Sequence, residues 1–212
     1  MEPVRVLIGV PSGDSVPVPF WLSFGVAVNT DKQTELYSVR GMNTVSARNK
    51  IVYKALTEKF THVFFMDSDM EFPPATLDRL LRHDKDIVGG FYLRKKKGYL
   101  PNAFKLGFSK GQKALTEFVT EFKEVEAIGT GCLLVKAEVF EKIGKPWFHY
   151  EPIEDAPDCH MATEDMVFSR RAREAGYQIF CDGLIACGHI GAHSVTPALV
   201  HGDKQMAKVE PV

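Results

Sequence analysis

Residues 61–72 read THVFFMDSDMEF, and the order of residue types in this stretch indicates the fold around it. The segment 62–66 is an apolar run with the length and composition of a buried strand. The polar triplet Asp67-Ser68-Asp69 follows, and Pro73-Pro74 predicts the start of a helix. The two carboxylates are therefore predicted to lie at the carboxyl end of a buried strand, where open α/β sheets bind ligands.

Asp67 and Asp69 are candidate metal ligands. Carboxylate oxygens suit Mg²⁺ or Mn²⁺, and phosphate oxygens usually complete the coordination shell. The alternative is that the triplet only forms a turn and caps the next helix, since Asp and Ser satisfy free backbone N–H groups there. A D-x-D pattern is weak by itself, and its position directly after a strand favours the metal site.

Composition narrows the class of protein. The 212 residues suit one large or two small domains, and 45% hydrophobic with 25% charged residues is typical of a soluble globular chain. Twenty-six basic and 27 acidic residues give a net charge of −1, which argues against a protein built to grip nucleic acid or an anionic membrane. No apolar run approaches the roughly 20 residues of a membrane span, and residues 1–10 resemble a first strand more than a signal peptide. We expect a cytoplasmic protein.

Apolar patterns predict strands and helices that alternate along the chain. The predicted strands are 5–10, 35–39, 62–66, 86–92, 100–108, 121–128, 132–135 and 178–181. The predicted helices are a buried one at 20–28 and others at 43–60, after Pro74, at 137–143 and at 163–175. This order predicts an α/β fold, in which a mixed, mainly parallel sheet is flanked by helices. One domain would span residues 1–212, with a loosely held tail from residue 198.

Three polar residues near predicted strand ends are candidates for ligand binding. Asp14 follows the first strand and is either a turn residue or a contact to a base or ribose. Arg48, early in the helix 43–60, is either solvated or turned towards a phosphate. Arg94 opens the basic run 94–97, which is either a solvated loop or a partner for phosphate or an acidic acceptor.

Glycine and aromatic positions suggest two further contacts. Gly131 belongs to a glycine-marked turn at 129–131, which either lets a ligand approach the backbone or permits a bulge. Trp147 lies on a loop predicted after the helix 137–143, where it either stacks on a sugar or base or belongs to the core.

The acidic pair Glu164-Asp165 opens the helix 163–175, behind Thr163 as a predicted N-cap. Acids in a first helical turn complement the helix dipole, and that would be a sufficient structural role. A carboxylate at such a position can also be aimed into a cleft as a general base.

The cysteines lack the spacing of a disulfide framework. Cys132, Cys159, Cys181 and Cys187 are expected to be reduced, mostly buried thiols. The alternative is a zinc site made by Cys181, Cys187, His189 and His193, although the first spacing is wide for a zinc knuckle.

The order of these motifs resembles a glycosyltransferase of the GT-A fold, and most of all the small family-2-like enzymes of bacteria and phages. The resemblance covers about Val4 to His193, and its most specific parts are residues 61–72, 86–94, 128–135 and 162–176. It implies a single GT-A-like (Rossmann-like) domain. It also implies metal-dependent transfer of a sugar from a nucleoside-diphosphate sugar, with a UDP-sugar expected, to a hydroxyl group with inversion.

The resemblance also implies roles for individual residues. Asp69 would bind Mn²⁺ or Mg²⁺ directly, Asp67 would lie nearer the ribose, and His189, or alternatively His193, would complete the metal shell. Asp165 of the acidic pair would be the base, beside Glu164. The residues expected to contact the donor are Asp14, Arg48, Asn49, Asp67, Ser68, Arg94, Gly131 and Trp147.

Two other functions fit the same motifs. A nucleotidyltransferase on a related fold would release pyrophosphate from a nucleoside triphosphate. A non-catalytic nucleotide-sugar-binding domain would bind the donor without turnover. For the transferase, a glycan, a protein side chain, a small metabolite or a modified nucleic-acid base are all candidate acceptors, and no motif indicates an oligomeric state.

Overall fold

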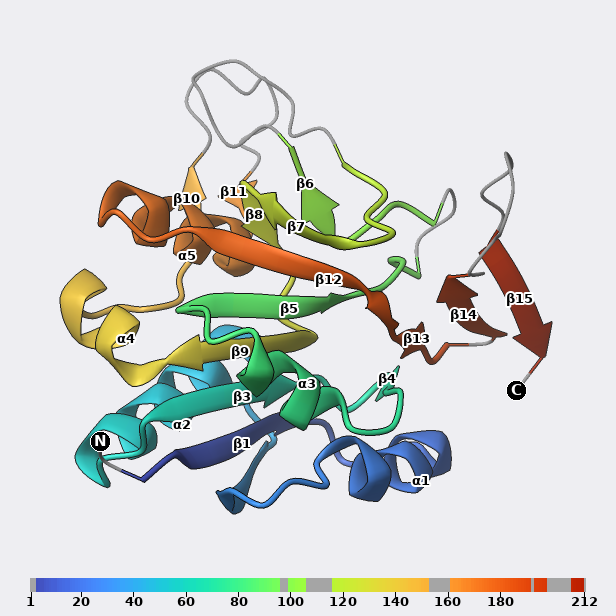
Figure 1. The fold of residues 1–212 in the computed structure, drawn as a ribbon, viewed down its shortest axis with the longest axis horizontal. Helices are drawn as coiled ribbons and strands as arrows, with labels where there is room; N and C mark the ends of the chain where they lie inside the picture. The colour runs from blue at the N-terminus through green and yellow to red at the C-terminus, as the bar shows by residue number, and fades with distance from the viewer. Residues whose placement is uncertain are drawn as a thin grey trace.

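A seven-stranded sheet with helices on both faces forms the body of the protein (Figure 1). The structure is a computed structural model that describes residues 3–95, 99–105, 116–152, 161–191, 193–197 and 207–211. In the last two ranges, and at Met161, it describes the backbone. None of the helices in these ranges is long and apolar enough to cross a bilayer.

The sheet has the strand order β2-β1-β3-β9-β5-β12-β7. Its strands are β1 (Arg5–Ser12), β2 (Gln33–Arg40), β3 (His62–Met66), β5 (Ile87–Phe91), β7 (Phe122–Val125), β9 (Cys132–Lys136) and β12 (Ile179–Ala186). Strands β1, β2, β3, β5 and β12 run in one direction, and β9 and β7 run against them. The mixed, mainly parallel α/β fold predicted from the sequence is confirmed.

The helices form one layer on each face of this sheet (Figure 1). They are α1 (Val18–Ala27), α2 (Thr44–Thr57), α3 (Thr76–Arg82), α4 (Ala137–Ile143) and α5 (Glu164–Glu174). Buried side chains of α2, α4 and α5 pack on one face, and those of α1 and α3 pack on the other. The sheet is therefore covered on both faces, as parallel strands require.

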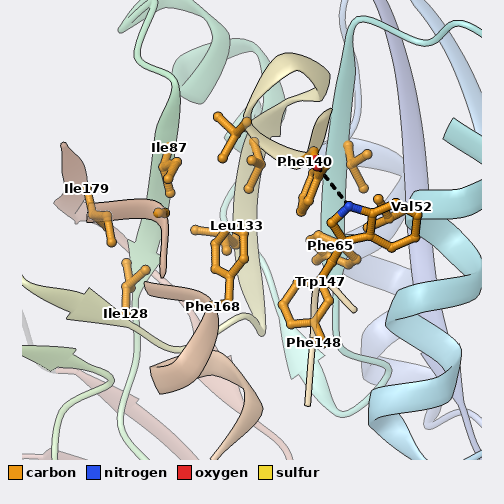
Figure 2. Close-up of a cluster of buried hydrophobic side chains, with 14 of the residues drawn as sticks. Val52, Phe65, Ile87, Ile128, Leu133, Phe140, Trp147, Phe148, Phe168 and Ile179 are labelled. Carbon is orange, nitrogen blue, oxygen red and sulfur yellow. Dashed lines mark hydrogen bonds between the residues drawn. The ribbon is translucent and has the colours of Figure 1, made fainter. Parts of the chain in front are cut away.

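Strand β3 lies at the centre of both layers because its residues alternate between the two faces. Val63 and Phe65 face the layer of α2, α4 and α5, while Phe64 and Met66 face the layer of α1 and α3. All four side chains are fully buried. Figure 2 shows the first of these layers, in which aromatic rings of α4, α5 and the connecting loop gather around Phe65. The continuous apolar run of this strand is thus explained by burial on both sides.

Short strands extend the fold beyond the main sheet. They are β4 (Met70–Glu71), β6 (Ala103–Phe104), β8 (Ala127–Ile128), β10 (Glu151–Pro152), β11 (Met161–Ala162), β13 (Gly188–His189), β14 (His193–Pro197) and β15 (Ala207–Pro211). Strands β15, β14, β13 and β4 form a second, four-stranded sheet. Residues 207–211 of the predicted loose tail are paired with β14, whereas residues 198–206 and 212 lie outside the described part of the chain.

Several predicted elements differ from the structure. The strand predicted at 100–108 is reduced to β6, and residues 106–108 lie outside the described part of the chain. The strand predicted at 121–128 is divided into β7 and β8 by Glu126, whose N–H bonds the Phe104 carbonyl. The strand predicted at 178–181 continues to Ala186 through a register shift after Asp182. Pairing partners decide these boundaries, and apolar patterns do not specify them.

Helix α1 is not the buried helix that its composition predicts. Of its residues only Phe20 and Ala27 are buried, whereas Leu22 is 75% and Trp21 47% exposed. The helix contacts the fold on one side, where the Phe20 ring lies against Phe72. Because α1 is apolar all round, its sequence carries no periodicity that separates the buried side from the exposed one.

Trp147 lies in the core and not at a ligand site. It is only 4% exposed, and its Nε1 donates to the Phe140 carbonyl at 2.8 Å (Figure 2). Asn49 of α2 holds the same loop: its side chain donates to the carbonyls of Val45 and Phe148 and accepts from the N–H groups of Trp147 and Phe148. The predictions that Trp147 and Asn49 contact a donor are therefore wrong, because both side chains are used by the core.

We expect Asn49→Ala to lower the free energy of unfolding by about 2 kcal/mol, since it leaves buried backbone groups without partners. Urea unfolding measures this loss. Gln178→Ala is the matched control, because its amide donates to Glu124 at the exposed surface. If Asn49→Ala lowers the free energy of unfolding no more than Gln178→Ala does, Asn49 does not hold this loop.

A pH dependence follows from His62 at the start of β3. Burial first, and then the charge of Lys136, lower the pKa of His62 to about 4 from an ordinary 6.5. The unfolded chain therefore takes up this proton before the folded one as the pH falls. The stability due to neutral His62 is complete above pH 6.5 and is lost towards pH 4. We expect His62→Gln to flatten this fall in the free energy of unfolding, and an unchanged slope would contradict the assignment.

Candidate active site

The Asp67-Ser68-Asp69 triplet lies at the carboxyl end of β3, as predicted, and a strand pairing brings a distant histidine to it. Strand β4 pairs antiparallel with β13, with Met70 opposite His189. The Ile190 N–H also donates to the Asp69 carbonyl at 2.7 Å. The second sheet therefore fixes His189 beside the triplet, and the prediction that these residues share a site is consistent with this geometry.

Asp69, His189 and Lys95 converge at this point. The Asp69 Oδ2 atom lies 2.5 Å from Lys95 Nζ and 3.6 Å from His189 Nε2. Burial by itself would raise the pKa of the Asp69 carboxyl, but His189 and Lys95 outweigh it and lower that pKa to about 2. Asp69 is therefore an ionised carboxylate at neutral pH.

The orientation of His189 suits a metal ligand. Its Nδ1 lies 3.0 Å from the Leu93 carbonyl, and because a carbonyl only accepts, Nδ1 carries the proton. In the neutral ring the Nε2 lone pair then faces Asp69. A histidine that donates its other N–H to a backbone carbonyl is the usual arrangement around a bound metal. Asp69 and His189 therefore fit a divalent cation as two protein ligands.

In the part of the chain that the structure describes, no three His, Cys, Asp or Glu side chains form a metal-binding group. A cation held by Asp69 and His189 would thus need phosphate or water oxygens to complete its shell, as Mg²⁺ commonly does. The side chain of His193, which belongs to the alternative zinc string and is the alternative to His189, lies outside the described part of the structure. Burial raises the pKa of the Cys181 and Cys187 thiols, which opposes the thiolate that zinc requires. Cys132, Cys181 and Cys187 are free and buried, as predicted, and Cys159 lies outside the described residues.

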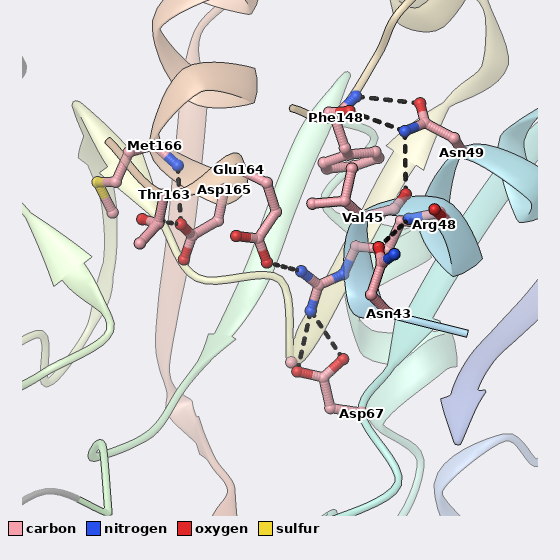
Figure 3. Close-up of polar contacts among 12 residues, drawn as sticks. Asn43, Val45, Arg48, Asn49, Asp67, Phe148, Thr163, Glu164, Asp165 and Met166 are labelled. Atoms are coloured by element: carbon pink, nitrogen blue, oxygen red, sulfur yellow. Dashed lines mark hydrogen bonds and ion pairs between the residues drawn. The ribbon is translucent and has the colours of Figure 1, made fainter. Parts of the chain in front are cut away.

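Asp67 joins an ion-pair network centred on the buried Arg48 (Figure 3). Arg48 Nη2 donates to both oxygens of Asp67, at 2.9 and 3.1 Å, and Nη1 donates to Glu164 Oε1. Arg48 is 3% exposed, so its charge is balanced by carboxylates and not by water. Burial opposes the charged form, but Asp67, Glu164 and Asp165 raise the pKa of Arg48 above its ordinary value.

This network changes the predicted roles of Arg48 and Asp67. Arg48 is neither solvated nor free to meet a phosphate, because two of its nitrogens are committed to carboxylates. Asp67 is a weaker candidate for a metal ligand than Asp69, since both of its oxygens already accept from Arg48. The network links α2, the end of β3 and the start of α5 across the site.

Asp165 is held in a different way from Glu164 (Figure 3). Its Oδ1 accepts from the Thr163 hydroxyl and, at 2.9 Å, from the Met166 N–H. Among the described residues, its Oδ2 accepts no hydrogen bond. Thr163 thus precedes the helix as predicted, but its hydroxyl orients Asp165 and makes no cap bond to a backbone N–H. Asp165 is a partly exposed carboxylate with one oxygen available.

Two cavities meet at the triplet. A smaller one of about 310 Å³ lies beside the ends of β1 and β2 and is lined in part by Asp14 and Ser68. A larger one of about 670 Å³ extends towards α5. Its lining includes most of the other predicted site residues: Arg48, Arg94, Glu164, Asp165 and His189. Asp67 and Asp69 line both cavities, so they stand at the junction.

Gly131 hydrogen-bonds the backbone of the triplet. Its carbonyl accepts from the Asp67 N–H at 3.0 Å, and its own N–H donates to the Tyr92 hydroxyl. A Cβ at residue 131 would lie 3.0 Å from the Tyr92 oxygen, so the close approach that this glycine permits is that of Tyr92 and not of a ligand. The prediction of a direct donor contact is therefore wrong for Gly131.

Tyr92 and Lys95 are the main site residues that the sequence analysis did not single out. Tyr92 lines the larger cavity and meets the His189 ring edge-on, with centroids 5.5 Å apart. Burial, followed by the charge of Asp67, raises the pKa of the Tyr92 hydroxyl well above its ordinary value, so it remains protonated. The position of Tyr92 at the end of the predicted strand 86–92 indicates a place near the ligand edge of the sheet. For Lys95, the basic run 94–97 is the corresponding indication.

Comparisons with known proteins support the fold. No model of a protein family matches the chain, and no curated protein sequence matches it. Among solved structures, the crystal structure of A197 from STIV is similar, with a TM-score of 0.63 and 18% sequence identity. The match covers 99% of this chain and 95% of that one. The chain therefore has an α/β, Rossmann-like fold over essentially its whole length.

The Arg48 network can be tested by a double-mutant cycle. We expect Arg48→Met to lower the free energy of unfolding by about 3–5 kcal/mol, because it leaves the buried Glu164 and the partly exposed Asp67 without a cation. Adding Glu164→Gln should recover part of this loss by removing one of the charges. Arg82→Met, at an exposed surface pair with Asp78, is the control and should cost under about 1 kcal/mol. If the losses in the free energy of unfolding from Arg48→Met and Glu164→Gln simply add, Arg48 and Glu164 are not coupled.

Proposed function

We propose that this protein is a metal-dependent glycosyltransferase of the GT-A type, similar to the family-2-like enzymes. It would transfer a sugar from a nucleoside-diphosphate sugar, with a UDP-sugar as the expected donor, to a hydroxyl acceptor. One observation carries the proposal: two cavities join at Asp67-Ser68-Asp69, with the Asp69–His189 pair at the junction and Asp165 along the larger cavity.

The two cavities suit the two parts of such a donor. The smaller cavity lies at the carboxyl ends of parallel strands, where open α/β sheets bind nucleotides, and offers Asp14 and Ser68 for polar contacts. The diphosphate would then cross the junction at Asp69. The larger cavity would hold the sugar and the acceptor, beside Glu164 and Asp165.

Asp69 and His189 would hold the metal ion. When bound, a divalent cation supplies positive charge to the diphosphate as it leaves. Asp69 suits this role because it stays ionised and because its partner His189 is oriented by the Leu93 carbonyl.

Asp165 is the favoured base. The acceptor oxygen would form a bond to the anomeric carbon of the sugar while the bond from that carbon to the diphosphate oxygen breaks. The bonding electrons leave with the nucleoside diphosphate, and the acceptor proton passes to the free oxygen of Asp165. Direct displacement of this kind inverts the anomeric carbon. Glu164 is less suited because it accepts from the Arg48 guanidinium, and its role would be to position that group.

Substitutions at Asp69 and Asp165 separate binding from catalysis. We expect Asp69→Asn to abolish Mn²⁺-dependent binding of a nucleoside diphosphate, measured by calorimetry with UDP, GDP, CDP and ADP. We expect Asp165→Asn to keep that binding and to lower turnover about 100-fold or more, the usual contribution of a general base. Asp31→Asn, at an exposed pair with Lys32, is the matched control.

Other outcomes distinguish the remaining functions. Binding of a nucleoside triphosphate with release of pyrophosphate would favour a nucleotidyltransferase. Donor binding without turnover, across glycan, protein, metabolite and nucleic-acid acceptors, would favour a binding domain. Full activity of Asp165→Asn at all pH values would remove Asp165 as the base.

A further inference from the structure

Lys95 occupies the position that a divalent cation at Asp69 would need. Its Nζ lies 2.5 Å from Asp69 Oδ2, the same oxygen that faces His189 Nε2 at 3.6 Å. A metal bound to that oxygen would be about 2.1 Å away, at the distance typical of Mg²⁺. The ammonium group and the metal cannot both approach this oxygen, because their positive charges repel and their positions overlap.

Residues 93–95 contact or supply both partners of Asp69: Leu93 orients His189, and Lys95 pairs with Asp69 directly. The Leu93 carbonyl accepts a hydrogen bond from His189 Nδ1–H, and Lys95 follows two residues later in the chain. The histidine is thus fixed by backbone, whereas the lysine reaches Asp69 through a flexible side chain. Lys95 is also partly exposed, with 35% of its side chain accessible, so it can leave Asp69 without unfolding the site.

A donor would offer Lys95 a second partner. Lys95 and Arg94 line the larger cavity together with Asp69, so the diphosphate expected at the junction would lie within reach of these cations. The leaving nucleoside diphosphate carries more negative charge than the intact donor. A lysine released from Asp69 could therefore neutralise charge that develops during transfer.

We infer that Lys95 is a resident cation that holds Asp69 until a divalent metal displaces it, and that the displaced ammonium group then binds the donor's diphosphate. This inference rests on the proposed function and adds to it. It assigns to one lysine both competition with the metal and contact with phosphate. It also explains why Asp69 has a close cationic partner in a site that fits a metal.

Mn²⁺ binding without nucleotide tests the competition. We expect Lys95→Met to bind Mn²⁺ about fivefold or more tightly than the wild type, because removal of a partly exposed ion pair frees Asp69. Lys95→Arg keeps the charge and should stay near the wild type. Lys123→Met is the matched control, because Lys123 of β7 pairs with Glu117 away from the site, and it should not change the affinity. Calorimetry or the Mn²⁺ resonance signal gives these affinities.

UDP binding at saturating Mn²⁺ tests the second half of the inference. We expect Lys95→Met to bind UDP about tenfold more weakly, since a charge-assisted bond to phosphate is lost. Unchanged UDP affinity would overturn the contact with the diphosphate. Mn²⁺ affinity that is equal to or weaker than the wild type in Lys95→Met would overturn the competition.

Asp69→Asn keeps the two proposals distinguishable. If the wild type binds Mn²⁺ and Asp69→Asn does not, the metal site stands, and an unaltered Lys95→Met overturns only the role of Lys95. If neither the wild type nor Lys95→Met binds Mn²⁺, the metal site fails, and the proposed function and this inference fail with it.

Discussion

The buried guanidinium of Arg48 is the interaction on which the site depends. It joins the end of β3, through Asp67, to the start of α5, through Glu164. Two elements that are far apart in the chain are thereby held at a fixed separation on either side of the larger cavity. A buried charge with two partners tolerates little displacement, since loss of either partner would leave an ion without compensation in a low-dielectric interior. Asp69 and Asp165 make no hydrogen bond to Arg48 and are the carboxylates to which we assign the proposed metal and base roles.

The four carboxylates of the site are therefore divided by their partners. Asp67 and Glu164 accept from Arg48, whereas Asp69 meets Lys95 and His189, and Asp165 is oriented by the hydroxyl of Thr163 and a helix N–H. The first two have a structural function in positioning, and the second two keep oxygens that face the cavities. Carboxylates that are close in sequence thus have different partners: Asp67 and Asp69 lie in the turn after β3, and Glu164 and Asp165 are consecutive residues at the start of α5.

Both sheets of the structure support the candidate metal position. The main sheet places Asp69 at the end of β3, and the second sheet brings His189 alongside it through the pairing of β4 with β13. The Asp67 N–H donates to the Gly131 carbonyl, and the Gly131 N–H donates to the Tyr92 hydroxyl, so the backbone before Asp69 is also held by the turn at 129–131.

The local features of the site could be predicted from the sequence, because they depend on short-range patterns. The apolar run before Asp67 and the helix that begins at Glu164 both follow from residue types within a few positions, and the structure has each of them. The alternation of strands and helices likewise determined the α/β class. Only the tertiary structure decided which side chains meet: Arg48 turns inward, Trp147 and Asn49 belong to the core, and His189 and Lys95 reach Asp69. These contacts depend on strand order and on the pairing of distant segments, and neither is encoded in a local period of the chain.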